Sequence, residues 1–169
     1  MTTLIQTETS VLNTQLTGPD GLVLYETATP TKLFSDRTTT ISRQGMMIAA
    51  IDWRLFGGAA LRFEGREALL DNVFPKSHIL SRSRTYTTRE GVSFKWKIGS
   101  GEFYCVAPDS GMSMASFDRV SFAPLRTKKS SLHINDLALG LIDELVVTWV
   151  IMEKLSSDRR KNAAGSGGG

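Results

Sequence analysis

The sequence has few of the features by which several classes of protein are recognised. Only one cysteine, Cys105, occurs among its 169 residues, so an intramolecular disulfide framework is excluded. The formal net charge is +3, from 20 Lys and Arg against 17 Asp and Glu, which is too small a surplus to indicate a nucleic-acid-binding protein. Hydrophobic residues make up 41% of the chain, which excludes collagen-like, fibrous and wholly disordered proteins.

Targeting and membrane-spanning segments are also missing from the pattern. Residues 1–16 carry neither a basic region nor an apolar core, so we expect no secretory signal peptide. The two most apolar stretches, 46–61 and 137–155, contain charged residues and lack the ~20 uninterrupted apolar residues that a membrane span needs. With one thiol and no glycosylation sequon, the sequence predicts an intracellular protein, cytoplasmic or peripheral to a membrane and not secreted.

Most of the chain has the pattern of short strands. Glycine and proline turns recur at intervals of about 8–12 residues, which is typical of a β sandwich or barrel. In the clearest segment, 92–98, polar and apolar residues alternate, so Phe94 and Trp96 fall on the face opposite Lys95 and Lys97. A further strand is expected around 82–86. The other expected strands are 11–16, 22–25, 37–41, 46–55, 60–63, 103–107, 112–117, 120–122 and 131–134.

The pattern changes once, near the C-terminus. Residues 141–161 are expected to form a helix, with a basic end at 159–161 that suits the helix dipole. Thr148 is the only polar residue in 145–152, so this part of the helix has no polar face and must be enclosed by protein. A buried strand over 145–152 is the alternative that its many Val and Ile residues leave open.

These patterns together predict one mostly β domain over residues 1–161. We expect an antiparallel β barrel that encloses the apolar C-terminal helix, because a helix without a polar face needs protein on all sides. Residues 162–169 are rich in Gly and Ala and predict a flexible tail.

Several local segments carry a family resemblance. They are Thr38-Thr39-Thr40-Ile41, Ile51-Asp52-Trp53, Arg84-Thr85-Tyr86-Thr87 with Gly91, Lys95-Trp96, and residues 147–155 with Arg159-Arg160. In this order they resemble an uncharacterised domain family of basidiomycete fungi, of the tubby-like group that includes LURP-one-related proteins and phospholipid scramblases. The resemblance implies a tubby-like barrel around the helix. It also implies contact with lipid, because tubby domains bind phosphoinositides and scramblases act on phospholipids.

A central basic region supplies the main functional hypothesis. Residues 37–104 carry 11 Lys and Arg against 6 Asp and Glu. If the strands that carry Arg82 and Arg84 and Lys95 and Lys97 pair with each other, these four side chains form a basic sheet face suited to a phosphate or anionic headgroup. We therefore predict a non-enzymatic module that binds anionic phospholipid or a membrane surface through these residues. An ordinary solvated sheet face is the alternative, because like charges also discourage edge aggregation.

Other chemistry finds less support in the sequence. Phe94 and Trp96 lie on the core face, so they are not expected to stack on nucleic-acid bases. Cys105 with His78 or His133 is a remote candidate for an enzyme, but no local signature links them. We expect no catalytic residues, no cofactor and no metal site, because two histidines and one cysteine lack ligand spacing. A protein-interaction or structural module without a small ligand is the second hypothesis.

Overall fold

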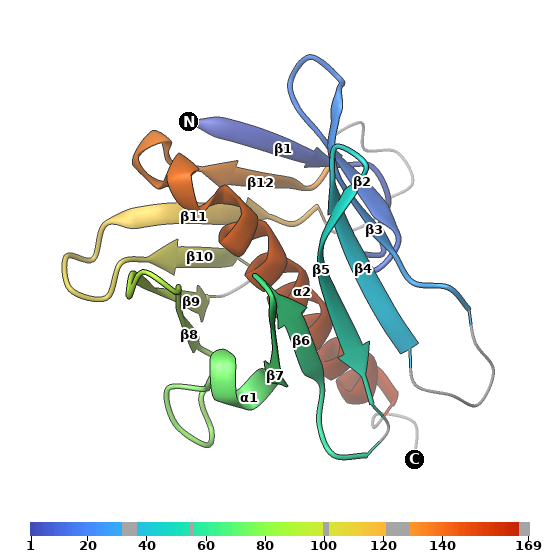
Figure 1. The fold of residues 1–169 in the computed structure, drawn as a ribbon, viewed down its shortest axis with the longest axis vertical. Helices are drawn as coiled ribbons and strands as arrows, with labels where there is room; N and C mark the ends of the chain where they lie inside the picture. The colour runs from blue at the N-terminus through green and yellow to red at the C-terminus, as the bar shows by residue number, and fades with distance from the viewer. Residues whose placement is uncertain (32–36, 55, 100–101, 121–128, 166–169) are drawn as a thin grey trace.

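A computed structural model of the chain describes residues 1–31, 37–54, 56–99, 102–120 and 129–165 (Figure 1). Over these residues twelve strands form one sheet in the order β7-β6-β5-β4-β3-β2-β1-β12-β11-β10-β9-β8, with antiparallel pairing throughout. The strands are β1 (Thr2–Gln6), β2 (Thr14–Thr17), β3 (Val23–Ala28), β4 (Arg37–Arg43), β5 (Met46–Trp53), β6 (Ala60–Phe63), β7 (Arg66–Leu69), β8 (Arg84–Thr87), β9 (Ser93–Ile98), β10 (Glu102–Val106), β11 (Ser113–Asp118) and β12 (Ser131–Ile134).

The helices are α1 (Leu70–Val73), the 3₁₀ helix η1 (Asp136–Leu141) and the long C-terminal helix α2 (Ile142–Gly165). Asn135 caps η1, because its side-chain oxygen accepts a hydrogen bond from the Leu137 amide at 3.0 Å. The ten consecutive residues 144–153 of α2 are buried, so the expected enclosed helix is confirmed and the buried-strand alternative is excluded. No helix of the described residues is long and apolar enough to cross a membrane.

The end of α2 differs from the expectation of a flexible tail. The helix runs to Gly165, so residues 162–165 are helical, and 166–169 lie outside the described residues. Ala163 and Ala164 explain the extension, because alanine loses the least free energy on entering a helix. The expected strand at 120–122 is absent at Val120, since β11 ends at Asp118, and residues 121–122 lie outside the described residues.

The strands lie around α2 and pack their inner side chains on it (Figure 1). The Phe117 and Trp149 rings have centroids 5.1 Å apart, which joins β11 to the helix. Thr148, the one polar residue of the apolar stretch, accepts a hydrogen bond from Trp96 Nε1 at 2.8 Å and donates to the Glu144 carbonyl oxygen at 2.6 Å. Its hydroxyl is therefore satisfied, as a buried polar group requires.

The sheet is open between its two end strands. β7 and β8 are consecutive strands of the chain and occupy opposite ends of the strand order, and no pairing joins them within the described residues. The connection between them covers part of the β8 edge, where the Thr85 amide donates to the Pro75 carbonyl oxygen at 3.1 Å. The mostly antiparallel β fold with a C-terminal helix is thus confirmed, and we name the opening between β7 and β8 the seam.

Candidate functional site

The four basic residues expected to share one sheet face lie on different sides of the sheet. β8 and β9 pair as expected, in a register that sets Arg84 opposite Trp96. Trp96 is fully buried and Arg84 is only 4% exposed, so both side chains lie on the core side. Lys95 and Lys97 alternate onto the outer face and are half-buried there, while Arg82 is exposed just before β8. The expectation of one exposed basic face is therefore wrong for Arg84.

Arg84 makes contacts that stabilise the fold. Its guanidinium donates to the Phe74 carbonyl oxygen and forms an ion pair with Asp71 Oδ1 at 2.8 Å. The guanidinium carbon also lies 5.8 Å from the centre of the Phe74 ring. These contacts fasten the end of α1 to the start of β8, so Arg84 holds the seam connection in place.

Lys95 and Lys97 lie on the outer face of β9. Lys97 is opposite Tyr104 of β10, and its Nζ lies 5.9 Å from the centre of the tyrosine ring. This geometry allows a weak cation–π contact on the surface. The two lysines remain available to solvent, but they are separated from Arg84 by the thickness of the sheet.

Arg82 belongs to a second basic group that includes a residue of α2. Arg159 is half-buried, and burial together with the nearby charges of Arg82 and Arg84 lowers the pKa of its guanidinium. Among the described residues, neither Arg82 nor Arg159 forms a hydrogen bond or ion pair. We call Arg82, Arg84 and Arg159 the arginine cluster. Of the three, Arg84 alone forms an ion pair with a carboxylate among the described residues, that of Asp71.

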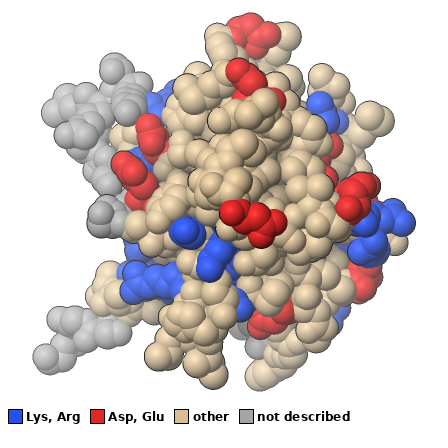
Figure 2. All heavy atoms as spheres, turned by 90° about the vertical axis from the view of Figure 1, so that its left-hand side faces the viewer, with Lys and Arg blue, Asp and Glu red and all other residues tan. Residues whose placement is uncertain are grey.

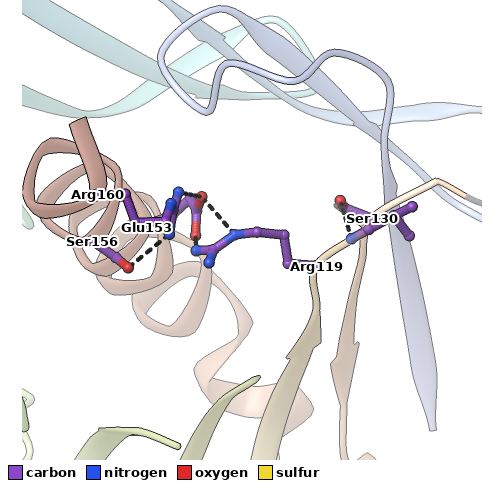
Figure 3. Close-up of polar contacts among 6 residues, drawn as sticks. Arg119, Ser130, Glu153, Ser156 and Arg160 are labelled. Carbon is purple, nitrogen blue, oxygen red and sulfur yellow. Dashed lines mark hydrogen bonds and ion pairs between the residues drawn. The ribbon is translucent and has the colours of Figure 1, made fainter. Parts of the chain in front are cut away.

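Two further arginines meet at a buried carboxylate on the same half of α2. Arg119, which follows β11, and Arg160 both contact Glu153, which is 6% exposed (Figure 3). Arg160 also donates to the Ser156 hydroxyl at 2.9 Å. One carboxylate thus serves two guanidinium groups, which leaves this contact with a positive surplus as well.

Exposed apolar side chains occupy the loops at this end of the molecule. Phe56 in the β5–β6 loop is 89% exposed, and Ile79 and Leu80 in the α1–β8 loop are 88% and 85% exposed. The β5–β6 loop follows Trp53, whose ring centre lies 5.1 Å from the Lys154 Nζ of α2. Figure 1 places both loops at the lower end of the molecule, where α2 also ends. We call Phe56, Ile79 and Leu80 the apolar loop tips.

One face of the molecule shows how the charged side chains are distributed. Figure 2 shows the side that is at the left of Figure 1. The uppermost charged atoms of that face are red, and the larger group of blue atoms lies in the lower half, where red atoms lie as well. Charges of both signs are therefore present on this face.

The cysteine and histidines expected as a remote catalytic group are not brought together. Cys105 is fully buried on the core side of β10, and burial raises the pKa of its thiol. His133 is paired with Ser116 and lies on the outer face, and His78 is exposed in the α1–β8 loop. Within the part of the chain that the structure describes, no group of three metal-ligating side chains occurs.

Sequence reasoning missed Arg159 as a site residue. The basic run at the end of the helix was interpreted only as a match to the helix dipole, and its proximity to Arg82 depends on packing between segments far apart in the chain. The exposed loop tips were also missed, because single apolar residues in loops have no periodic pattern.

The comparisons with known proteins give a family without a function. No curated protein and no solved structure matches the chain. The model of a family of unknown function, DUF6593, matches residues 9–158, which include β2 to β12 and most of α2. The chain belongs to this DUF6593 family.

Proposed function

We propose that the protein is a non-enzymatic module that binds anionic phospholipid at a membrane surface. The contact is made by the end of the molecule at which α2 terminates, which carries Arg159 with Arg82 near it and the two loops with the apolar tips. The observation that carries the proposal is the combination of two arginines, Arg82 and Arg159, that lack acidic partners among the described residues, with apolar side chains that are almost fully exposed.

The arginine cluster provides the attraction for a phosphate group. Arg159 is half-buried among positive charges, so a bound anion would offset both the repulsion and part of the desolvation. Arginine presents a planar set of donors that fits phosphate oxygens in a bidentate arrangement. Arg84 has a structural part in this site, because its contacts with Asp71 and Phe74 fix the start of β8.

The apolar loop tips favour a membrane over a free phosphate compound. Large apolar side chains that are almost fully exposed and lie at one end of a protein are typical of a surface that a protein or membrane partner covers. An aromatic or aliphatic side chain that leaves water contributes roughly 1.5–3 kcal/mol. Phe56, Ile79 and Leu80 lie on two different loops at one end, which suits insertion into the interfacial layer of a bilayer.

The tubby-like relationship belongs to the same proposal. A sheet of twelve antiparallel strands around a helix that is buried on all sides supports a tubby-like barrel with its last seam left open. Lipid contact would then agree with the phosphoinositide and phospholipid chemistry of that group. Fungal origin and the intracellular location stay predictions.

Co-sedimentation with vesicles tests the proposal. We expect the protein to pellet with phosphatidylcholine vesicles that contain phosphatidylinositol bisphosphate, and much less with phosphatidylcholine alone. The double variant Arg82→Gln/Arg159→Gln should bind about 30-fold more weakly, because each basic residue near the surface contributes about 1 kcal/mol. Circular dichroism should show that the variant keeps its fold, since neither arginine has a hydrogen-bond or ion-pair partner among the described residues.

Lys95→Gln/Lys97→Gln is the matched control, because it removes the same charge from the outer sheet face. This control should retain nearly full binding. Equal and negligible pelleting with both vesicles would end the proposal. A larger loss from the lysine pair than from the arginine pair would place the contact on the sheet face instead.

A second proposal concerns a protein partner at the opposite end. Exposed apolar residues lie on two adjacent hairpins, which are held together where the Gln44 amide donates to the Leu24 carbonyl oxygen at 3.0 Å. They are Leu22, Val23, Met46 and Met47. Light scattering at several concentrations tests self-association through this surface, and Met46→Ser/Met47→Ser should abolish any association it reports.

A further inference from the structure

A groove of about 390 Å³ lies at the seam between the two end strands of the sheet. Arg66 and Ala68 of β7 form part of one wall, and Thr85 and Thr87 of β8 form part of the other. The Phe63 ring lies deeper in the groove and belongs to the core cluster. The groove is therefore an opening in the wall of the sheet that reaches the apolar interior.

The main chain of β7 is free on the seam side. The Leu70 amide donates to the Ala59 carbonyl oxygen at 2.8 Å, so the even-numbered residues of this strand pair with β6. Because hydrogen bonding alternates along an antiparallel strand, the amide and carbonyl groups of Glu67 and Leu69 point to the seam. No strand pairs with them among the described residues.

The β8 wall offers a shorter free edge. The Thr85 amide bonds to the Pro75 carbonyl oxygen on the side away from β9, and alternation sets the Thr87 main chain on that same side. The loop before β8 covers the first of these positions and leaves the second open. β7 is thus the longer template for an added strand.

Tyr86 supplies a polar group at the groove. Its side chain is 6% exposed, lines the groove and contacts the rings of Phe63, Phe74 and Phe94. Among the described residues its hydroxyl has no hydrogen-bond partner. Burial and the charge of Glu64 raise the pKa of Tyr86 to about 12, so the hydroxyl stays protonated at neutral pH and can donate a hydrogen bond to a ligand in the groove.

We propose that the seam groove binds an extended polypeptide segment of a partner protein, which adds to the free edge of β7 and accepts a hydrogen bond from the Tyr86 hydroxyl. A polypeptide is the occupant that fits, because the edges of β7 and β8 along the seam carry main-chain amides and carbonyls that no strand pairs with among the described residues, and their complement is another main chain. β7 and β8 run in opposite directions, so a single added strand is antiparallel to one and parallel to the other.

The side chains of the groove define the segment further. Residues of an added strand alternate between the interior and the solvent, so every second residue would lie against Phe63 and Tyr86 and should be apolar. At the turn end of the groove, Glu64 and Arg66 form no ion pair among the described residues. A segment with one residue of each charge sign on its outward positions is complementary to them. This proposal is independent of lipid binding, which uses the other basic residues.

Titration with a synthetic peptide, followed by two-dimensional amide NMR, tests the proposal. The probe is acetyl-Lys-Val-Thr-Val-Glu-amide, and the comparison peptide has proline in place of threonine, which removes a central main-chain donor. We expect shift changes concentrated at 66–69 and 86–88 with the first peptide, and binding at least several-fold weaker with the second. Absence of change at these residues up to millimolar peptide, or equal binding of both peptides, overturns strand addition.

Tyr86→Phe separates the hydroxyl from the ring that packs in the core. Loss of one hydrogen bond should weaken the affinity roughly 2- to 10-fold. The folded state should be little affected, because the hydroxyl has no hydrogen-bond partner among the described residues. Tyr104→Phe is the matched control, since it removes a hydroxyl from the outer face of β10. Equal affinity of Tyr86→Phe and the unmodified protein overturns the role of the hydroxyl.

Discussion

The two ends of α2 differ in how their charges are matched. At the first turn, Asp143 accepts hydrogen bonds from the Tyr25 hydroxyl and from the Arg43 guanidinium, the latter at 3.1 Å. In the C-terminal half, Arg159 lies near Arg82 and Arg84 and has no carboxylate partner among the described residues. At the first end Asp143 is paired within the protein, whereas at the second end Arg159 has no carboxylate partner among the described residues.

The difference in charge pairing suggests a structural role for the first end of α2 and a binding role for the C-terminal end. The helix dipole favours acids at the start and bases toward the end, so α2 alone explains the sign of the charge at each end. It does not explain why Arg82 and Arg159 lack partners among the described residues, nor why loops with exposed apolar side chains lie at the same end of the molecule. A ligand that is anionic and apolar accounts for both features at the C-terminal end.

The largest effect is expected from the buried segment that joins the two ends. Val147 is fully buried in α2, so Val147→Asp places a charge where no partner is available. The cost should be comparable to the whole stability of a domain, about 5–15 kcal/mol, and the variant should not fold. Near-ultraviolet circular dichroism and thermal melting test this. Val147→Thr keeps the shape and should remain folded, and a cooperatively folded Val147→Asp would show that α2 is not enclosed.

The next largest effect on stability is expected from removing the charge of one carboxylate at either end of α2. Glu153→Gln should lower the free energy of unfolding by about 2 kcal/mol, because Arg119 and Arg160 lose their shared, buried carboxylate but keep an acceptor. Asp143→Asn should cost about 1 kcal/mol, since Arg43 is partly exposed. Urea denaturation measures both. Only Glu153→Gln should also strengthen vesicle binding, and weaker binding would contradict the assignment of the surplus charge.

The smallest effect concerns Glu144 at the first end. Burial, with the charges of Glu64 and Asp143, raises the pKa of its carboxyl above the ordinary 4.5. The folded state therefore favours the protonated form, and this contribution to stability is present below pH 4.5 and lost as the pH rises through the raised pKa. Glu144→Gln should stabilise the protein at pH 7 and lose this advantage below pH 4.5. Urea denaturation that gives equal differences at both pH values would contradict the shift.

The sequence predicted the elements whose pattern is local. The enclosed helix followed from an apolar run with one polar residue, Thr148, and the β9 strand followed from strict alternation. β1 and β7 were not expected, because β1 buries only Leu4 and Gln6 and β7 is an exposed edge strand with Arg66 and Glu67. β7 is an edge strand without an apolar face, and β1, although central in the sheet, has too few buried apolar residues to give a pattern.

The error at Arg84 has a physical reason in the register of one hairpin. Alternation correctly predicted that Arg84 and Tyr86 share a face of β8. The turn after Thr88 sets Tyr86 opposite Phe94, so this face is the core face and carries Arg84 inward with it. Which face is buried depends on that pairing, as do the meeting of Arg82 with Arg159 and the position of the seam. None of these is encoded in the local sequence.

Site-specific labelling at the two ends tests the central claim most directly. A nitrobenzoxadiazole label is attached to Phe56→Cys at the end where α2 terminates, or to Met47→Cys on the hairpin beside the first turn, while the buried Cys105 is shielded from the reagent. Vesicles that contain phosphatidylinositol bisphosphate are then added. The account predicts a blue-shifted and brighter emission from the label at position 56 and no change at position 47. The same response at both positions, or a response at position 47 alone, would contradict it.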